Sequence, residues 1–354
     1  MVIIMQAGAP ESEVDAVLAA VEKAGFRPWV NPGVERKVIA LLGAVDAEKA
    51  ELVDHFSALP GVERVTLISE PYKLASRRTR AESTVIQVGP VSIGGNELAI
   101  VAGPCSIENR EQMFEAARAV KEAGANLLRG GAFKPRTSPY SFQGLGVSGL
   151  QLLAEAGKAT GLPTVTEVLH PDDLDVIAEY ADVIQVGARN MQNFRLLQDV
   201  GQVGKPVILK RNPGCRIQDL LMASEYIMLE GNPNVVLCER GITSFENATR
   251  YTLDLNAVPV IKRFSHLPVI VDPSHAAGDW RYVTSIALGA IAAGADGIMV
   301  EVHPNPALAL SDGPQSLRPE KFQDLMASLA RVAAAVGRRV AQPARPGVGE
   351  DAGE

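Results

Sequence analysis

The chain has 354 residues and a mass of 37.6 kDa, enough for two domains or for one large barrel with an appended module. Hydrophobic residues make up 47% of it and charged residues 21%, which permits a large core and excludes a disordered chain. The formal net charge of −7 argues against a nucleic acid or an anionic membrane as partner. Taken as a bulk number, the same charge also disfavours phosphorylated ligands.

The cysteines and the apolar segments indicate the cellular compartment. Cys105, Cys215 and Cys238 are too few for a disulfide scaffold and leave one thiol unpaired. The apolar start Met1–Met5 runs into glycine, proline and glutamate without the hydrophobic region of a secretory signal. We find no run of about 20 apolar residues that would span a membrane. These features predict a soluble cytoplasmic protein with reduced thiols.

Residues 1–70 have the element order of a separate small domain. This order, βαββαβ, is typical of the ferredoxin-like split motif. The segment contains no evident acid–base pair, metal-ligand spacing or phosphate loop, so we interpret it as a regulatory rather than a catalytic domain. The predicted strands and helices are, in order, Val2–Met5, Glu11–Ala24, Arg27–Val30, Lys37–Leu42, Asp46–Ser57 and Val62–Ile68.

Residues 71–97 are predicted to form a linker and a β-hairpin. The linker carries a basic cluster, Arg77, Arg78 and Arg80, which we interpret as a solvated surface. Two short strand-like runs, Val85–Val88 and Val91–Ile93, flank a Gly-Pro turn and predict a hairpin that covers another part of the protein.

Over residues 98–340 an apolar run and a helical segment alternate eight times. The runs are rich in Val and Ile without polar alternation, as in strands buried on both faces. Eight such repeats predict a (β/α)8 barrel, and a doubly wound sheet is the alternative. The tail, residues 341–354, is rich in Pro, Gly, Glu and Ala and is predicted to be disordered. The predicted strands are Leu98–Ala102, Asn126–Arg129, Pro163–Val168, Val183–Val186, Pro206–Leu209, Val235–Cys238, Leu267–Val271 and Gly297–Val300.

In such a barrel the catalytic groups lie at the C-terminal ends of the strands and in the loops that follow. Every predicted strand is followed there by an ionisable or metal-ligating side chain, which favours a functional rim. Arginine binds carboxylate or phosphate in bidentate geometry, and lysine supplies a point charge. Cations gathered at one mouth therefore predict anionic substrates, although each could instead pair with a nearby carboxylate. Six of the rim residues are cations: Arg129, Lys134, Arg136, Arg189, Lys210 and Arg240.

A second group of rim residues predicts a metal site. Cys105, His275 and Glu301 follow the first, seventh and eighth strands, and Asp312 lies a few residues further on. A thiolate, an imidazole and two carboxylates suit a divalent transition metal with room for water or substrate. Taken singly, Cys105 is equally compatible with a buried filler, His275 with a satisfied loop residue and Asp312 with a turn before glycine.

The two remaining cysteines and His303 are not assigned to the metal site. Cys238 lies within a strand and is read as core, and Cys215 lies in a loop and is assigned no role. His303, near the rim, is a candidate for a group behind the metal ligands. We find no compelling Ser-His-Asp or Cys-His arrangement and no dinucleotide loop in the required form.

Residues 128–144, Leu-Arg-Gly-Gly-Ala-Phe-Lys-Pro-Arg-Thr-Ser-Pro-Tyr-Ser-Phe-Gln-Gly, resemble the signature of 3-deoxy-D-arabino-heptulosonate 7-phosphate (DAHP) synthases. The resemblance is to the bacterial subfamily with an N-terminal ferredoxin-like domain, and it extends from Val2 to about Val340. The Lys-Pro-Arg-Thr element distinguishes this family from the octulosonate 8-phosphate synthases, which share the barrel and the metal site. Supporting motifs lie at residues 102–106, 187–194, 238–241, 271–275 and 311–313.

The family reaction joins phosphoenolpyruvate to erythrose 4-phosphate at the start of the shikimate pathway to aromatic amino acids. The resemblance implies that Cys105, His275, Glu301 and Asp312 hold a divalent metal, either Mn, Fe, Co or Zn. It implies that Arg129, Lys134, Arg189, Lys210 and Arg240 surround phosphoenolpyruvate and that Pro135, Arg136 and Thr137 bind erythrose 4-phosphate. Glu167 matches a position near the attacking water. The expected catalytic residues are Lys134, Lys210, Glu167, Cys105 and His275.

The resemblance also implies a homotetramer whose ferredoxin-like domain binds tyrosine or phenylalanine as a feedback inhibitor. One departure is visible: Asn212-Pro213-Gly214-Cys215 stands where the family usually continues with Gly, which predicts a changed loop with Lys210 kept. Two alternatives stay open, a synthase that uses arabinose 5-phosphate and a non-catalytic amino-acid-sensing protein. The intact metal and cation sets argue against the second, because neither is needed for folding.

Overall fold

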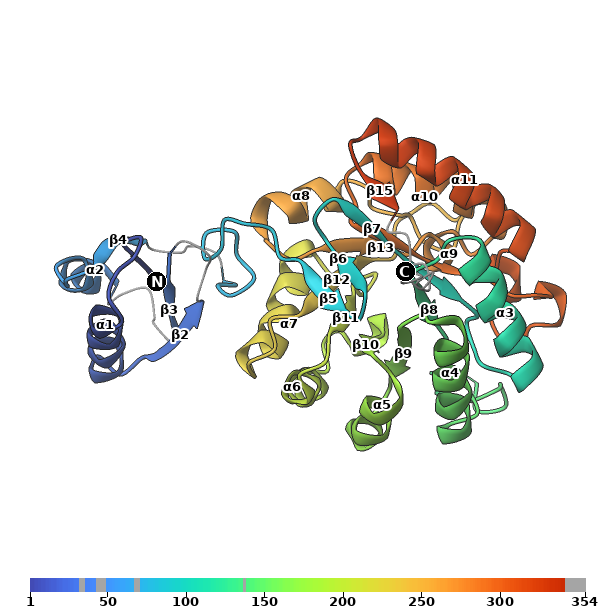
Figure 1. Ribbon diagram of the computed structural model, residues 1–354, viewed down its shortest axis with the longest axis horizontal. Coiled ribbons are helices and arrows are strands. Elements are labelled where there is room, and N and C mark those ends of the chain that lie inside the picture. Colours follow the sequence, from blue (N-terminus) through green and yellow to red (C-terminus); the bar gives the residue numbers. More distant parts are fainter. Residues whose placement is uncertain (32–35, 43–48, 67–70, 136–137, 341–354) are drawn as a thin grey trace, which may run out of the picture. The chain divides into compact units, whose positions relative to one another are not determined.

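The computed structural model describes residues 1–31, 36–42, 49–66, 71–135 and 138–340 (Figure 1). The chain divides into two compact units. The smaller consists of Met1–Glu82 with Phe264–His266, and the larger of Ser83–Arg263 with Leu267–Glu354.

The smaller unit contains a four-stranded antiparallel sheet with the strand order β2-β3-β1-β4. Its core includes Ile3, Val17 and Phe56, all fully buried, because the apolar face of each helix packs on the sheet. The predicted ferredoxin-like order is confirmed. Residues 32–33, 46–48 and 67–68 of the predicted turn, helix and strand lie outside the described residues. The elements are β1 (Val2–Met5), α1 (Glu11–Lys23), β2 (Arg27–Asn31), β3 (Val38–Leu42), α2 (Lys49–Ser57) and β4 (Val62–Thr66).

The larger unit is a closed barrel of eight parallel strands. The first and last of these strands pair in register from Gly297 opposite Ala99 to Glu301 opposite Gly103, which closes the sheet. The predicted (β/α)8 barrel is therefore confirmed, and the doubly wound alternative, which requires open edges, is wrong. The strands are β7 (Glu97–Gly103), β8 (Leu127–Arg129), β9 (Thr164–Val168), β10 (Val183–Val186), β11 (Val207–Lys210), β12 (Val235–Glu239), β13 (Val269–Val271) and β14 (Gly297–Glu301).

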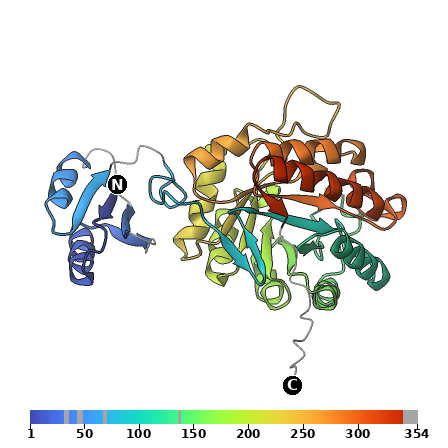
Figure 2. The same cartoon turned by 45° about the horizontal axis from the view of Figure 1, so that its top comes forward.

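Helices surround the barrel strands (Figures 1 and 2). Each buries one apolar face; in the helix after β10, for example, Leu196, Leu197 and Val200 are buried. A short strand, β15 (Arg339–Val340), pairs in parallel with the start of β7. The helices are α3 (Arg110–Glu122), α4 (Val147–Thr160), α5 (Leu174–Tyr180), α6 (Phe194–Val203), α7 (Ile217–Leu229), α8 (Ala257–Phe264), α9 (Pro273–Ala277), α10 (Trp280–Ala292) and α11 (Pro319–Ala335).

The predicted hairpin is formed by β5 (Ile86–Val88) and β6 (Val91–Ile93). Its apolar side chains pack in one cluster with Val165, Val183 and Ile208, which lie at or near the beginnings of their strands. The hairpin thus closes the N-terminal end of the barrel and leaves the C-terminal end for the site. Among the described residues, we find no helix that combines the length and the apolar character needed to cross a membrane. The predicted disordered tail, residues 341–354, lies outside the described part of the chain.

Candidate active site

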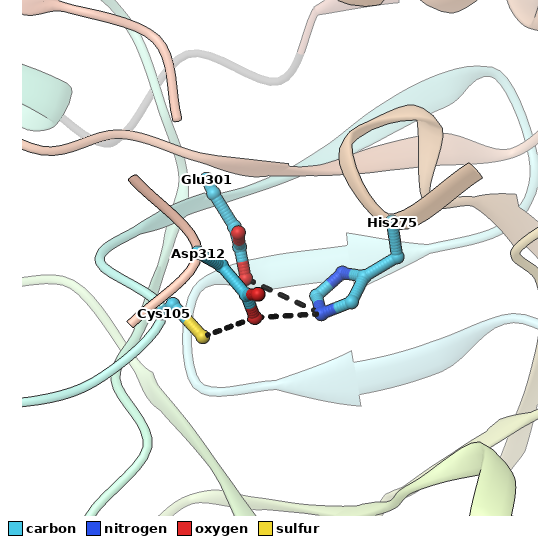
Figure 3. Close-up of side chains that lie close together, drawn as sticks. All are labelled: Cys105, His275, Glu301 and Asp312. Atoms are coloured by element: carbon cyan, nitrogen blue, oxygen red, sulfur yellow. Dashed lines mark hydrogen bonds and ion pairs between the residues drawn. The ribbon is translucent and has the colours of Figure 1, made fainter. Parts of the chain in front are cut away.

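Four predicted metal ligands meet at the C-terminal end of the barrel (Figure 3). Cys105 follows β7, His275 lies in α9, Glu301 ends β14 and Asp312 precedes a short 3-10 turn. One ligand atom from each lies within 4.8 Å of the others. The Cys105 thiol donates to Asp312 Oδ2 at 3.1 Å, and His275 Nε2 lies 3.4 Å from Glu301 Oε1 and 4.0 Å from Asp312 Oδ2. We call these four residues the metal cluster.

The donor set fits a divalent transition metal. Glu301 is fully buried, and its Oε1 accepts no hydrogen bond although Arg129 Nη1 lies 3.1 Å away. A buried carboxylate oxygen without a donor is unfavourable, and a bound cation would supply the missing partner. Soft thiolate and imidazole ligands combined with carboxylates favour a first-row transition metal over calcium or magnesium.

Protonation in the cluster depends on such a cation. Burial, together with the negative charge of Glu301, raises the pKa of the Cys105 thiol to about 12. A coordinated thiol is instead deprotonated, because the metal charge dominates its surroundings. Burial also lowers the pKa of His275, which favours the neutral imidazole that a metal binds.

Asp272, which the sequence interpretation did not assign to the site, supports His275 from behind. Asp272 caps α9: its Oδ1 accepts the backbone N–H of His275 at 2.9 Å. Its Oδ2 lies 2.7 Å from His275 Nδ1, so Nε2 is the nitrogen that faces the metal cluster. Such carboxylate–histidine pairs fix the ring orientation at metal sites. An Asp three residues before a candidate His ligand, followed by Pro at the first helical position, was the signal available in the sequence.

A cleft of about 140 Å³ lies beside the metal cluster and shares His275 and Asp312 with it. Pro135 and Glu167 line it as well, so the structure gathers these predicted residues in one place. The remaining two, Arg136 and Thr137, lie outside the described residues. Six cations line the cleft, of which all but the last were predicted from the sequence: Arg129, Lys134, Arg189, Lys210, Arg240 and Arg250.

The cleft cations differ in their partners. Lys210 Nζ binds Asp272, and Arg129 lies beside Glu301. These two cations therefore pair with a nearby carboxylate, which is the alternative that the sequence left open. Lys134 Nζ instead lies 3.0 Å from the Cys105 carbonyl oxygen and 3.2 Å from its sulfur. Within the described part of the chain, Arg189 and Arg240 form no ion pair. Positive charge therefore remains available for anions in the cleft.

Several cleft residues were missed from the sequence. Asn212 and Pro213 of the unusual loop line the cleft beside Lys210, and Asn212 Nδ2 donates to the Ala188 carbonyl at 3.1 Å. Arg250 and Tyr251 come from the long loop after β12. No spacing rule marks them, because they reach the cleft only through the path of that loop.

The structure also describes the two remaining cysteines and His303. Cys238 is buried in β12, and Cys215 is half-buried in the loop after β11. His303 Nε2 lies 3.5 Å from Glu108 Oε1, and the same oxygen accepts the backbone N–H of Leu310 at 2.7 Å. His303 thus contacts the residue that holds the segment leading to Asp312.

Two family models match the chain. The model of the DAHP synthetase I family matches residues 78–336, and that of the DAHP synthase ferredoxin-like domain matches residues 1–70. The chain belongs to the DAHP synthetase I family. The predicted family and its transferase class are thereby confirmed.

Relatives of this chain carry DAHP and octulosonate names. The phospho-2-dehydro-3-deoxyheptonate aldolase of Thermotoga maritima is 48% identical over 96% of this chain and 100% of its own length. The crystal structure of this DAHP synthase matches with a TM-score of 0.77 at 47% identity, over 96% of this chain and 99% of that one. The 2-dehydro-3-deoxyphosphooctonate aldolase of Caulobacter vibrioides is 33% identical over 68% of this chain and 90% of its own length.

Proposed function

We propose that the protein catalyses the metal-dependent condensation of phosphoenolpyruvate with D-erythrose 4-phosphate and water. The products are 3-deoxy-D-arabino-heptulosonate 7-phosphate and phosphate, in the first step of the shikimate pathway. The observation that carries the proposal is the metal cluster beside a cleft lined by six cations. This arrangement suits two anionic substrates, one of which carries a carbonyl group to be polarised.

The cleft cations bind and orient the substrates. Arg189 and Arg240 offer guanidinium forks to the phosphate and carboxylate of phosphoenolpyruvate, and Lys210 and Lys134 add point charges. The guanidinium carbon of Arg240 lies 4.4 Å from the centroid of the Tyr251 ring, and this contact limits the motion of the Arg240 side chain. Holding two anions that repel each other in water at reacting distance is an orientation effect worth several kcal/mol.

The metal cluster would hold the divalent ion through Cys105 Sγ, His275 Nε2 and one carboxylate oxygen each of Glu301 and Asp312. When bound, the ion supplies Lewis-acid polarisation of the aldehyde oxygen of the sugar phosphate. Lys134 Nζ, close to the Cys105 sulfur, is placed to donate a proton to that oxygen as the carbon–carbon bond forms.

Water must then add to the former enol carbon, and the resulting tetrahedral carbon expels phosphate. Glu167, at the cleft wall, is the carboxylate we assign to orient this water and accept its proton. Gly187 supports this arrangement, since a Cβ there would lie 1.8 Å from Glu167 Oε1. The missing side chain leaves the space that the Glu167 carboxylate occupies.

The choice of erythrose 4-phosphate over arabinose 5-phosphate is supported by the Lys-Pro-Arg-Thr element at residues 134–137. Pro135 lines the cleft, and we assign the sugar phosphate to Arg136 and Thr137. A second support is that residues 1–70 match the family model of the DAHP synthase ferredoxin-like domain.

We assign regulation to residues 1–70, since none of the described residues among them belongs to the metal cluster or lines the cleft. Feedback inhibition by tyrosine or phenylalanine in a homotetramer is the form that the family resemblance implies. A thiolate ligand at Cys105 is compatible with a reducing cytoplasm. A chain that lacks residues 1–70 should lose this inhibition, and unchanged inhibition would contradict the regulatory role.

The test of the proposed reaction follows the loss of the enol absorbance of phosphoenolpyruvate with erythrose 4-phosphate. We expect turnover by the metal-loaded enzyme, loss of turnover after chelation, and recovery on adding Mn²⁺, Fe²⁺, Co²⁺ or Zn²⁺. Full turnover in protein shown to be metal-free would contradict the metal role.

A further inference from the structure

Gln315 links a loop arginine to the metal cluster. Its side chain is only 2% exposed, and its Nε2 donates to Glu301 Oε2 at 2.7 Å. Its Oε1 accepts from Arg250 Nη1 at 3.0 Å. The amide therefore has its donor on Glu301 and its acceptor on Arg250, which fixes the orientation of the amide group.

Arg250 reaches the second acidic member of the cluster as well. Its Nη1 lies 3.5 Å from Asp312 Oδ1. In both carboxylates the contacts divide in the same way between the two oxygens. Glu301 Oε2 and Asp312 Oδ1 are held by Gln315 and Arg250, whereas Glu301 Oε1 and Asp312 Oδ2 face His275.

The backbone holds Arg250 in this position. Its N–H donates to the Ala277 carbonyl at 3.0 Å, and the next N–H, of Tyr251, donates to Ala276 at 2.8 Å. Both acceptors belong to α9, the helix that carries His275. The loop after β12 is thereby tied to the element that positions the imidazole of the cluster.

Asp312 itself has an unusual backbone. Its φ of 50° is the one positive value for a residue other than glycine in the described part of the chain. Such conformations persist where surrounding contacts over-determine them. Gln315 contributes here too, because its N–H donates to the Asp312 carbonyl at 3.2 Å.

We propose that Gln315 and Arg250 are positioning residues for the metal: they hold Glu301 and Asp312 so that each presents one oxygen to it. The inference rests on the metal site of the proposed function. Partners behind metal ligands orient them, and their loss typically lowers metal affinity about 10–100-fold. Holding one oxygen of each carboxylate away also restricts the number of oxygen ligands, which disfavours Ca²⁺ relative to a transition metal.

The test titrates the metal-free full-length protein with Co²⁺, by calorimetry and by the near-ultraviolet absorbance of a cobalt–thiolate bond. Gln315→Leu should weaken Co²⁺ binding about 10–100-fold and change the visible spectrum of the bound ion. It should also reduce the preference for Co²⁺ over Ca²⁺. A residue that merely stabilised the loop would leave spectrum and preference unchanged.

Arg250→Ala keeps the proposal testable if the Gln315 variant fails to fold, because this side chain is 40% exposed. We expect about tenfold weaker Co²⁺ binding. Arg281→Ala is the matched control: this exposed arginine pairs with Asp279 and should leave Co²⁺ affinity unchanged. The double variant should bind little more weakly than Gln315→Leu alone, since the two residues act as one unit.

The outcomes separate two failures. Wild-type protein that binds no Co²⁺ would overturn the metal part of the proposed function and this inference with it. Wild-type protein that binds Co²⁺, with folded Gln315 and Arg250 variants that match its affinity and spectrum, would overturn this inference alone.

Discussion

Asp272 Oδ2 lies 2.7 Å from Nδ1 of His275 and thereby joins the metal cluster to the anion cleft. The same oxygen binds Nζ of Lys210, so one fully buried carboxylate contacts both a proposed metal ligand and a cation of the cleft. Burial alone would raise the pKa of Asp272, but the charges of His275 and Lys210 outweigh it and hold that pKa well below its usual range. The carboxylate therefore stays ionised, and displacement of either partner disturbs the other.

The first prediction removes this charge while keeping the shape of the side chain. Asp272→Asn should weaken divalent metal binding about 10–100-fold, because His275 loses the carboxylate that orients its ring. It should also raise the KM for phosphoenolpyruvate, because Lys210 loses its partner. Metal titration and initial-rate kinetics measure the two effects.

Asp279→Asn is the control for Asp272→Asn. Asp279 caps the next helix, α10, and asparagine caps equally well, so both quantities should stay at wild-type values. A normal metal affinity in Asp272→Asn would show that His275 does not depend on this carboxylate.

The second prediction tests Glu167 through its neighbour. Gly187→Ala should displace the Glu167 carboxylate, because the new methyl group would lie within 1.8 Å of Oε1 unless the flexible side chain moves. If Glu167 handles the proton of the attacking water, kcat should fall about 10²–10⁴-fold, and Glu167→Gln should behave alike. Gly289→Ala, in the middle of α10 with its nearest neighbour at 3.4 Å, should leave kcat unchanged. A wild-type kcat in Glu167→Gln would exclude the assigned role.

The third prediction concerns a buried ion pair between the C-terminal ends of β11 and β12. Arg211 Nη1 binds Glu239 Oε2 at 2.8 Å, and Glu239 Oε1 accepts the N–H of Gly241 at 2.7 Å. Arg211→Met leaves the fully buried Glu239 without its cation, which should lower the free energy of unfolding by about 3–5 kcal/mol. Urea unfolding measures it. Arg195→Ala breaks an exposed pair with Asp199 and should cost less than about 0.5 kcal/mol. Similar losses in both variants would contradict the argument from burial.

The fourth prediction is a pH dependence. Burial, together with the charges of Arg80 and Arg77, lowers the pKa of His266 from 6.5 to about 4, although its Nε2 is bonded to the Leu74 carbonyl oxygen at 2.7 Å. Because the folded-state pKa is depressed, the unfolded chain binds more protons between about pH 6.5 and pH 4. Stability is then fully present above pH 6.5 and falls as the pH drops through this window.

From pH 7 to pH 5 the His266 contribution to the free energy of unfolding should fall by about 2 kcal/mol. Urea unfolding of the wild type and of His266→Gln at both pH values measures it, since the difference between the two proteins isolates this residue. Parallel pH profiles for the two proteins would contradict the assigned pKa.

The sequence predicts this fold well because its signals are local. Buried parallel strands carry uninterrupted apolar runs, as in Val235–Cys238, and glycine or a polar residue marks the end of most of them. The strand ends in turn predict which side chains meet, because parallel strands place all their C-terminal ends on one rim. Cys105, Lys210 and Glu301 could be assigned in this way before their distances were known.

The supporting residues could not be predicted in the same way. Gln315 and Arg250 lie 65 positions apart and meet only because two loops after different strands fold over the same side of the barrel. Their residue types are ordinary surface types, and no periodicity marks them. Asp272 carried a local signal, the helix cap before Pro273, but this signal indicated a turn rather than a connection to Lys210.

The net charge of the whole chain does not predict the charge of the cleft. The chain carries a formal charge of −7, yet six cations line a single cleft. Arg189 and Arg240 take part in no ion pair within the described residues. The local arrangement, not the total, determines which ligands the cleft can bind.

The proposed reaction is tested most sharply by comparing two aldose phosphates as substrates of the metal-loaded wild-type enzyme. Consumption of phosphoenolpyruvate is followed with erythrose 4-phosphate and, separately, with arabinose 5-phosphate, and the seven-carbon product is identified by mass. We expect a kcat/KM for erythrose 4-phosphate well above that for arabinose 5-phosphate, with one phosphate released per phosphoenolpyruvate consumed. Consumption with arabinose 5-phosphate but not with erythrose 4-phosphate would contradict the proposed reaction.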